Sequence, residues 1–166
     1  YTNTLLLVRD ELGLYGNILP VNISRYYSSS NFVASNQTEN FYGKGYRFNY
    51  ESKLTLSSNT YTWDTMDGRT IEFHPDTSNT SKWVESNLEN ENTYTLWSTN
   101  SGLIIESTDG TEYNFDAMKR LKSISNDNGE VSIVYKTEVG LEKLIDYIED
   151  AIGRKFNFPI DISPQW

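Results

Sequence analysis

One short pattern recurs along this chain: a turn containing Asp or Asn followed by Gly, and then a segment with apolar residues at every second position. The dipeptides are Asp67-Gly68, Asp109-Gly110 and Asn128-Gly129. Because Gly adopts positive φ at little steric cost, such pairs are strong indicators of β-hairpin turns. Side chains alternate between the two faces of a strand, so each following segment places its apolar set on one face. The pattern predicts a series of antiparallel hairpins.

The predicted strands carry mainly aromatic side chains. Aromatic residues make up 14% of the chain, and long aliphatic runs are absent. Tyr, Trp and Thr favour half-buried, pleated surfaces, which supports the same prediction. The alternating sets are Tyr46, Phe48 and Tyr50; Tyr61 and Trp63; Ile71 and Phe73; Tyr94 and Leu96; Tyr113 and Phe115; Val131, Ile133 and Tyr135; and Phe156, Phe158 and Ile160.

The segment 141–152 fits two structures. Its apolar residues recur at helical spacing, which taken alone favours an amphipathic helix. Comparison with an earlier segment favours a strand, because Leu144 lies six residues before Asp150 as Leu121 lies six before Asp127. In both cases a Gly and an alternating aromatic or apolar segment follow. We predict a strand at 141–152.

The regions outside these segments are less regular. Residues 19–27 are predicted to form one strand and residues 28–40 a loop. The polar stretches 76–83 and 87–93 are predicted to be loops inside the array, because strands resume within a few residues.

Charge and composition exclude several classes of protein. A net charge of −9 argues against nucleic acid and anionic membranes as partners. No segment approaches the roughly 20 apolar residues that span a bilayer, and the run 5–8 lacks the basic flank of a signal peptide. The absence of Cys excludes disulfides and cysteine metal sites. Because the chain begins with Tyr1, we expect it to be part of a longer polypeptide.

The turns themselves are similar to one another. Asp150 to Arg154 has the form Asp-x-x-Gly-Arg, and Asp116 to Arg120 has the same length with Lys119 in place of Gly. Asp64 to Arg69 is a third version, one residue longer. Asp accepts hydrogen bonds from backbone N–H groups two or three residues on, which fixes such a turn. A single hairpin is marginally stable in water, so units of this kind need to stack.

This repeated unit resembles the Rhs/YD-repeat family: bacterial rearrangement-hotspot proteins, wall-associated polymorphic toxins and the teneurin-like proteins of animals. The family unit is Tyr-Asp-x-x-Gly-Arg-Leu, several residues, Asp-x-x-Gly and a Tyr-rich strand. "FDAMKRLKSISNDNGEVSIVY" (115–135) follows it, with Phe for Tyr and Lys for Gly. "LPVNISRYYSSS" (19–30), "GKGYRFNYESKLTL" (43–56) and "YTWDTMDGRTIEF" (61–73) resemble the segment that precedes the repeats.

The resemblance implies an all-β, mostly antiparallel fold: an extended or curled sheet of hairpins that forms part of a β-shell. We expect a single β domain over residues 1–166, with 1–60 as the pre-repeat segment and 61–166 as the first repeats. The implied function is structural: the start of a shell that encloses or presents a toxin or effector, in a secreted or cell-surface bacterial protein. The implied partners are further repeats of the same polypeptide and the enclosed effector.

No catalytic residue, cofactor or metal ligand is assigned on this interpretation. The residues given a structural role in turns or repeats are Asp64, Asp67, Gly68, Arg69, Asp109, Gly110, Phe115, Asp116, Arg120, Asn128, Gly129, Asp150, Gly153 and Arg154.

The alternative function is a carbohydrate-binding or adhesion module of a secreted protein, with Trp63, Trp83 and Trp97 stacking on cell-surface sugars. A glycoside hydrolase would need two converging carboxylates, and the sequence selects no pair among its 23 acidic residues. A calcium loop around 126–130 is rejected, because ligand positions fall on apolar and aromatic residues. His74 is the only histidine, and we expect it to have a structural or surface role.

Overall fold

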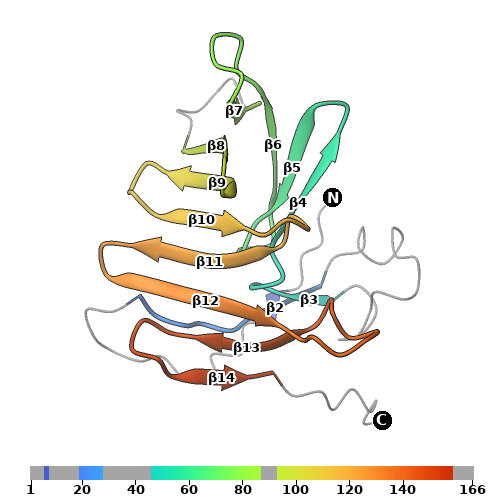
Figure 1. The fold of residues 1–166 in the computed structure, drawn as a ribbon, viewed down its shortest axis with the longest axis vertical. Helices are drawn as coiled ribbons and strands as arrows, with labels where there is room; N and C mark the ends of the chain where they lie inside the picture. Colours follow the sequence, from blue (N-terminus) through green and yellow to red (C-terminus); the bar gives the residue numbers. More distant parts are fainter. Residues whose placement is uncertain (1–5, 8–18, 28–45, 87–92, 159–166) are drawn as a thin grey trace.

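The computed structural model describes residues 6–7, 19–27, 46–86 and 93–158. Within these ranges all regular secondary structure is β-strand, and no residue is helical (Figure 1). The strands are β1 (Leu6–Leu7), β2 (Arg25–Tyr27), β3 (Tyr46–Phe48), β4 (Lys53–Ser57), β5 (Thr60–Asp64), β6 (Thr70–Pro75), β7 (Lys82–Glu85), β8 (Tyr94–Thr99), β9 (Gly102–Ser107), β10 (Glu112–Phe115), β11 (Leu121–Asn126), β12 (Gly129–Tyr135), β13 (Ile145–Glu149) and β14 (Lys155–Asn157).

The strands form two antiparallel sheets in which chain neighbours are also neighbours in space. One sheet has the order β1-β2-β3, and the other runs from β4 to β14 without a crossover. This meander confirms the predicted all-β fold built from successive hairpins.

The large sheet curls back on itself without closing into a barrel. Figure 1 shows β9 to β14 stacked one above another, with the β4–β5 hairpin steeply inclined to them. The N–H of Leu54 donates to the carbonyl of Lys119 at 2.8 Å, and the N–H of Leu121 donates to the carbonyl of Ser52 at 2.9 Å. These two bonds join the start of β4 to the start of β11 and hold the curl.

Aromatic rings from distant strands meet inside the curl. The ring of Trp63 on β5 lies 5.0 Å from that of Tyr94 on β8 and 5.2 Å from that of Tyr113 on β10. Phe73 and Phe115 are completely buried beside them. Each fully buried side chain of this size contributes roughly 1.5–3 kcal/mol. The concave side of this part of the sheet is therefore a packed core.

The N-terminal residues pack against the large sheet at two places. Phe48 on β3 meets Phe158, just after β14, edge to face at 5.0 Å. Tyr26 on β2 covers the turn after β5, where a Cβ added to Gly68 would lie 3.2 Å from the Tyr26 ring. Val21 joins the same core. The small sheet is thus fixed to both the first and the last hairpins of the large one.

The predicted single strand at 19–27 is wrong in extent, because only Arg25–Tyr27 is a strand. The preceding N–H groups bond to side chains instead of to a neighbouring strand. Those of Asn22 and Ser24 donate to the hydroxyl of Tyr50 at 3.3 Å and to Oδ1 of Asn49 at 3.0 Å. The predicted loop at 28–40 and the part of loop 87–93 before residue 93 lie outside the described residues.

The strand predicted at 141–152 is confirmed over Ile145–Glu149 only, since turns occupy both ends of the segment, and the structure explains its helical spacing. A bulge between β12 and β13 leaves Asp146 without a direct partner, so that Ile145 and Ile148, three residues apart, are both buried. The same irregularity between β10 and β11 buries Leu121 and Ile124. The predicted loop 76–83 is shorter than expected, since β7 begins at Lys82.

Candidate functional site

Three turns of the large sheet share one backbone geometry, and we call them the Arg turns: residues 65–69, 116–120 and 150–154. In each, the N–H of the first residue donates to the carbonyl of the fifth at 2.9 Å. The N–H of the fourth donates to the carbonyl of the first at 2.9–3.3 Å, and this fourth residue has φ between 63° and 84°. Residues 107–111 repeat the backbone pattern and end in Thr instead of Arg.

Within two of the Arg turns the side chains match atom for atom. Oδ1 of Asp116 accepts N–H groups from two and four residues on, at 2.9 and 3.0 Å, while Oδ2 accepts from Nε of Arg120 at 2.9 Å. The corresponding distances from Asp150 are 3.1 and 2.8 Å, with 2.7 Å to Nε of Arg154. One carboxylate thus satisfies two backbone donors and holds the guanidinium in a fixed orientation.

The first Arg turn uses a different first residue. Thr65 occupies the place of Asp, while Asp64 is the last residue of β5, and Asp67 supplies the carboxylate to Nε of Arg69 at 2.8 Å. The turn therefore contains five residues, as the other two Arg turns do, and is not one residue longer. Sequence comparison aligned the acidic residue, whereas the structure conserves the backbone geometry.

Electrostatics follow from these contacts. Burial alone would raise the pKa of Asp150. The backbone N–H and the guanidinium of Arg154, together with the backbone N–H of Ile152, lower this pKa instead. The pKa of Asp67 is lowered in the same way, against burial, by Thr65 and Arg69. Hydrogen bonds from Thr111 lower the pKa of Asp109, next to Gly110. These carboxylates are stabilised in the ionised form and act as turn anchors.

The Asn128-Gly129 pair lies at a hairpin and Gly129 has positive φ, as predicted, but Gly129 follows the two-residue loop instead of lying within it. Asn126 pairs with Gly129, so Asp127 and Asn128 form the loop and Gly129 begins β12 with φ of 128°. A Cβ at Gly129 would lie 2.5 Å from Cβ of Ala151. The absence of a side chain lets this turn touch the Arg turn 150–154.

Arg120 also reaches beyond its own turn to the next hairpin. Its Nη1 donates to the carbonyl of Glu142 at 2.6 Å, and its guanidinium carbon lies 3.9 Å from the ring centre of Tyr135. The hydroxyl of Tyr135 donates to the carbonyl of Leu121 at 2.7 Å. We call this set the arginine clamp. Sequence reasoning identified Arg120 and missed its two partners, because no local pattern links residues 15 and 22 positions apart.

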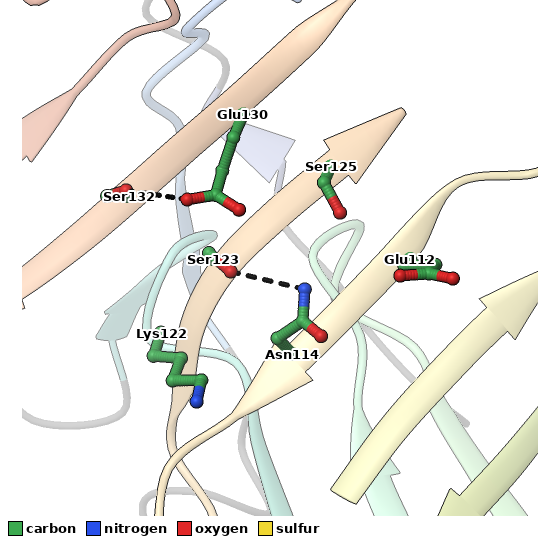
Figure 2. A pocket seen from close by; sticks show the side chains of 7 residues that line it. All are labelled: Glu112, Asn114, Lys122, Ser123, Ser125, Glu130 and Ser132. Carbon is green, nitrogen blue, oxygen red and sulfur yellow. Dashed lines mark hydrogen bonds between the residues drawn. The ribbon is translucent and has the colours of Figure 1, made fainter. Parts of the chain in front are cut away.

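A polar groove lies on the open face of β10, β11 and β12 (Figure 2). Nδ2 of Asn114 donates to Oγ of Ser123 at 3.2 Å within it. Its lining residues are Glu112, Asn114, Lys122, Ser123, Ser125, Glu130 and Ser132. Among the described residues there is no group of three or more acidic or His side chains able to hold a metal ion.

The tryptophans differ in their exposure. Trp63 is 1% exposed, and its Nε1 donates to Oγ of Ser52 at 2.8 Å. Trp83 packs edge to face on Tyr61 at 5.2 Å. Trp97 is half-buried, with the ammonium of Lys82 5.6 Å from its ring centre. Of the three candidates for sugar stacking, Trp63 is therefore inaccessible.

His74 lies on the surface. Its Nδ1 is 3.5 Å from the hydroxyl of Thr60, and its Nε2 is 3.9 Å from the carboxylate of Glu72. These neighbours give the imidazole ordinary surface contacts on β5 and β6.

Comparison with known protein families gives a match over the first part of the chain. A family model described as "Domain of unknown function (DUF6531)" matches residues 4–73, and no curated protein matches the chain. Within the described ranges, no helix has the length and apolar character needed to cross a membrane. The similarity to this uncharacterised domain covers the small sheet and β4 to most of β6, while the second and third Arg turns lie outside it.

Proposed function

We propose that this chain is a structural segment of a secreted or cell-surface bacterial YD-repeat protein. It forms the start of a β-sheet shell that encloses or presents a toxin or effector. The observation that carries this proposal is the recurrence of one turn, with the same backbone bonds, at 65–69, 116–120 and 150–154. A recurring unit that packs on its neighbours is the basis of arrays and shells.

The edges of the large sheet also support an array that extends in one direction. β4 at one edge is bonded in part to residues 119–121, while the small sheet packs against both the first and the last hairpins. β14 at the other edge pairs with β13 alone among the described strands. An unpaired strand edge presents N–H and C=O groups to any further strand. Among the described residues, the first edge of the large sheet is partly bonded and its last edge has no further strand.

The partners in this proposal are further repeats of the same polypeptide, which pair with β14, and the effector inside the shell. The segment itself contributes no chemistry to the effector. Its role is to form the first strands of the shell and to keep their curvature through the aromatic core and the Arg turns.

Electron cryomicroscopy of the longer natural polypeptide that contains this segment tests the proposal. We expect the large sheet to continue past β14 through further hairpins and to surround a cavity. A separate, compact domain after residue 158, with the β14 edge left unpaired, would contradict it.

The alternative is a carbohydrate-binding or adhesion module. Trp97 pairs with Ile104, which pairs with Asn114, so the half-buried indole lies on the same face of the sheet as the polar groove. A ring on the same face as hydroxyl and carboxylate groups offers both the stacking and the hydrogen bonds by which a sugar is bound.

A glycan array distinguishes the two functions. The alternative predicts binding that is lost in Trp97→Ala and retained in Thr95→Ala, a neighbouring change on the same face. If the unchanged chain binds no glycan, the carbohydrate-binding alternative is refuted and only the structural proposal remains.

A further inference from the structure

The second and third Arg turns differ in what surrounds their guanidinium groups. Arg120 holds Asp116, the carbonyl of Glu142 and the ring of Tyr135, and its side chain is 23% exposed. Arg154 holds Asp150 through Nε with the same geometry, and its side chain is 38% exposed. Among the described residues, its two Nη atoms have no hydrogen-bond partner and no ring lies over it.

In the first Arg turn, too, a tyrosine affects the arginine of the turn. Burial alone would lower the pKa of Arg69, but the hydrogen bond and charge of Asp67 raise it, with a further contribution from the hydroxyl of Tyr94. Tyr94 belongs to β8, outside the hairpin that contains Arg69. The contact geometry that carries the inference is therefore that of Arg120 and Tyr135.

We propose that Arg154 is a docking site for the next hairpin of the same polypeptide, which supplies an aromatic ring over the guanidinium and a backbone carbonyl to Nη. In the arginine clamp, Tyr135 and Glu142 follow Arg120 by 15 and 22 residues. The same offsets from Arg154 fall after Trp166, the last residue of the sequence. The inference rests on the proposed function, because it takes the following segment to be a further repeat.

The geometry around Arg154 suits this partner. The Asp150 side chain, which is 2% exposed, holds Arg154 through Nε, and among the described residues no hydrogen bond uses either Nη atom. β14 begins at the next residue, so a strand added to its open edge would end beside Arg154, just as β12 ends beside Arg120. A planar guanidinium combines ring stacking with donation to a carbonyl, which an ammonium group does less well.

The test extends the chain with its own unit. In the extended chain, residues 1–154 are followed by a copy of residues 121–158, which places the copied Tyr135 and Glu142 at the same offsets from Arg154. Thermal unfolding is measured for this chain and the 166-residue chain, each with Arg154 and with Arg154→Lys. In the 166-residue chain the substitution weakens the contact with Asp150 and affects no other contact among the described residues. We expect the extended chain to lose about 2–4 °C more in Tm than the 166-residue chain.

A matched control changes the copied tyrosine to Leu, which should abolish that additional loss. Equal losses in the two backgrounds would overturn the proposal, as would an extension that adds no stability. Concentration-dependent dimers of the extended chain in sedimentation would also overturn it, because the occupant would then be a second copy.

The outcomes separate this inference from the proposed function. A natural polypeptide whose sheet continues past β14 while Arg154 remains solvated would refute the docking site alone. A polypeptide with no further hairpins would refute the shell, whatever the extended chain does.

Discussion

At the scale of single residues, the Arg turns depend on one backbone conformation. Their fourth position has positive φ in all three cases, and it is occupied by Gly68, Lys119 and Gly153. A side chain in this left-handed region costs roughly 1–2 kcal/mol. The sequence pattern located these turns through Asp and Gly, and it located the middle one even though Lys stands where Gly is expected.

Substituting Gly for Lys119 should therefore stabilise the protein by about 1 kcal/mol. The gain from removing strain at φ of 63° exceeds the added freedom of the unfolded chain. Urea unfolding measures the change. Met118→Gly serves as the control, because Met118 is exposed in the same turn without positive φ, and it should lose about 0.5–1 kcal/mol. Destabilisation by Lys119→Gly would show that Lys119 is not left-handed.

Gly129 is required for a second reason besides its φ of 128°. In Gly129→Ala, and more so in Gly129→Val, the new Cβ would overlap Cβ of Ala151, so we expect a loss of about 2–3 kcal/mol. Gly110→Ala is the control for strain alone, because its Cβ would meet no atom within 4 Å. Ala151→Gly should restore part of the stability of Gly129→Ala, and a double variant no better than the single one would refute the contact.

At the scale of elements, each Arg turn is held by a carboxylate, and hairpins are joined by contacts to their neighbours. The bulges at Lys122 and Asp146 show why segment 141–152 looked helical: an extra residue turns period two into a spacing of three. The arginine clamp joins the turn before β11 to the loop after β12. Stability in this array therefore depends on links between hairpins as well as on each hairpin.

Asp150→Ala should destabilise the protein by about 2–3 kcal/mol at pH 7, because two backbone N–H groups and a guanidinium lose their acceptor. The folded-state pKa of Asp150 lies below its unfolded value, so its contribution is present above that value and disappears as the pH falls below about 4. Asp109→Ala, in a turn without Arg, is the control and should cost less than 1 kcal/mol. Equal losses at pH 7 would contradict the anchoring role of Asp150.

Glu51 should give a pH dependence of the opposite sign. It lies between the small sheet and β4, where burial raises its pKa to about 7, against the N–H of Phe48 and the charges of Arg47 and Lys53. Because the folded-state pKa of Glu51 is above its unfolded value, this group stabilises the folded state in full at pH below about 4.5. The stabilisation is lost as the pH rises through about 7. After allowance for solvent screening it amounts to about 1–2 kcal/mol.

The measurement is the free energy of unfolding between pH 4.5 and 8 for the unchanged chain and for Glu51→Gln. We expect the decline of stability with rising pH to flatten in the variant. An identical slope in both proteins would show that Glu51 titrates at its ordinary pKa.

At the scale of the whole molecule, the sequence predicted the large sheet better than its surroundings. Turn residues such as Asp109-Gly110 and alternating rings determine hairpins locally, so the meander could be predicted. The irregular course of residues 19–24 could not, because its N–H groups bond to Asn49 and Tyr50, more than 20 residues away. The curl was expected only from the family resemblance, and the contacts that hold it join β4 to β11, which lie far apart in the chain.

The central claim is that this segment begins a continuous β-sheet shell, which further strands extend from the edge strand β14. Hydrogen–deuterium exchange of residues 155–157, compared between the 166-residue chain and the longer polypeptide that we propose contains it, tests it most directly. We predict that the amides of β14 that face away from β13 exchange rapidly in the short chain and become protected in the long one. Equal exchange in both would show that no strand follows β14 and would contradict the account.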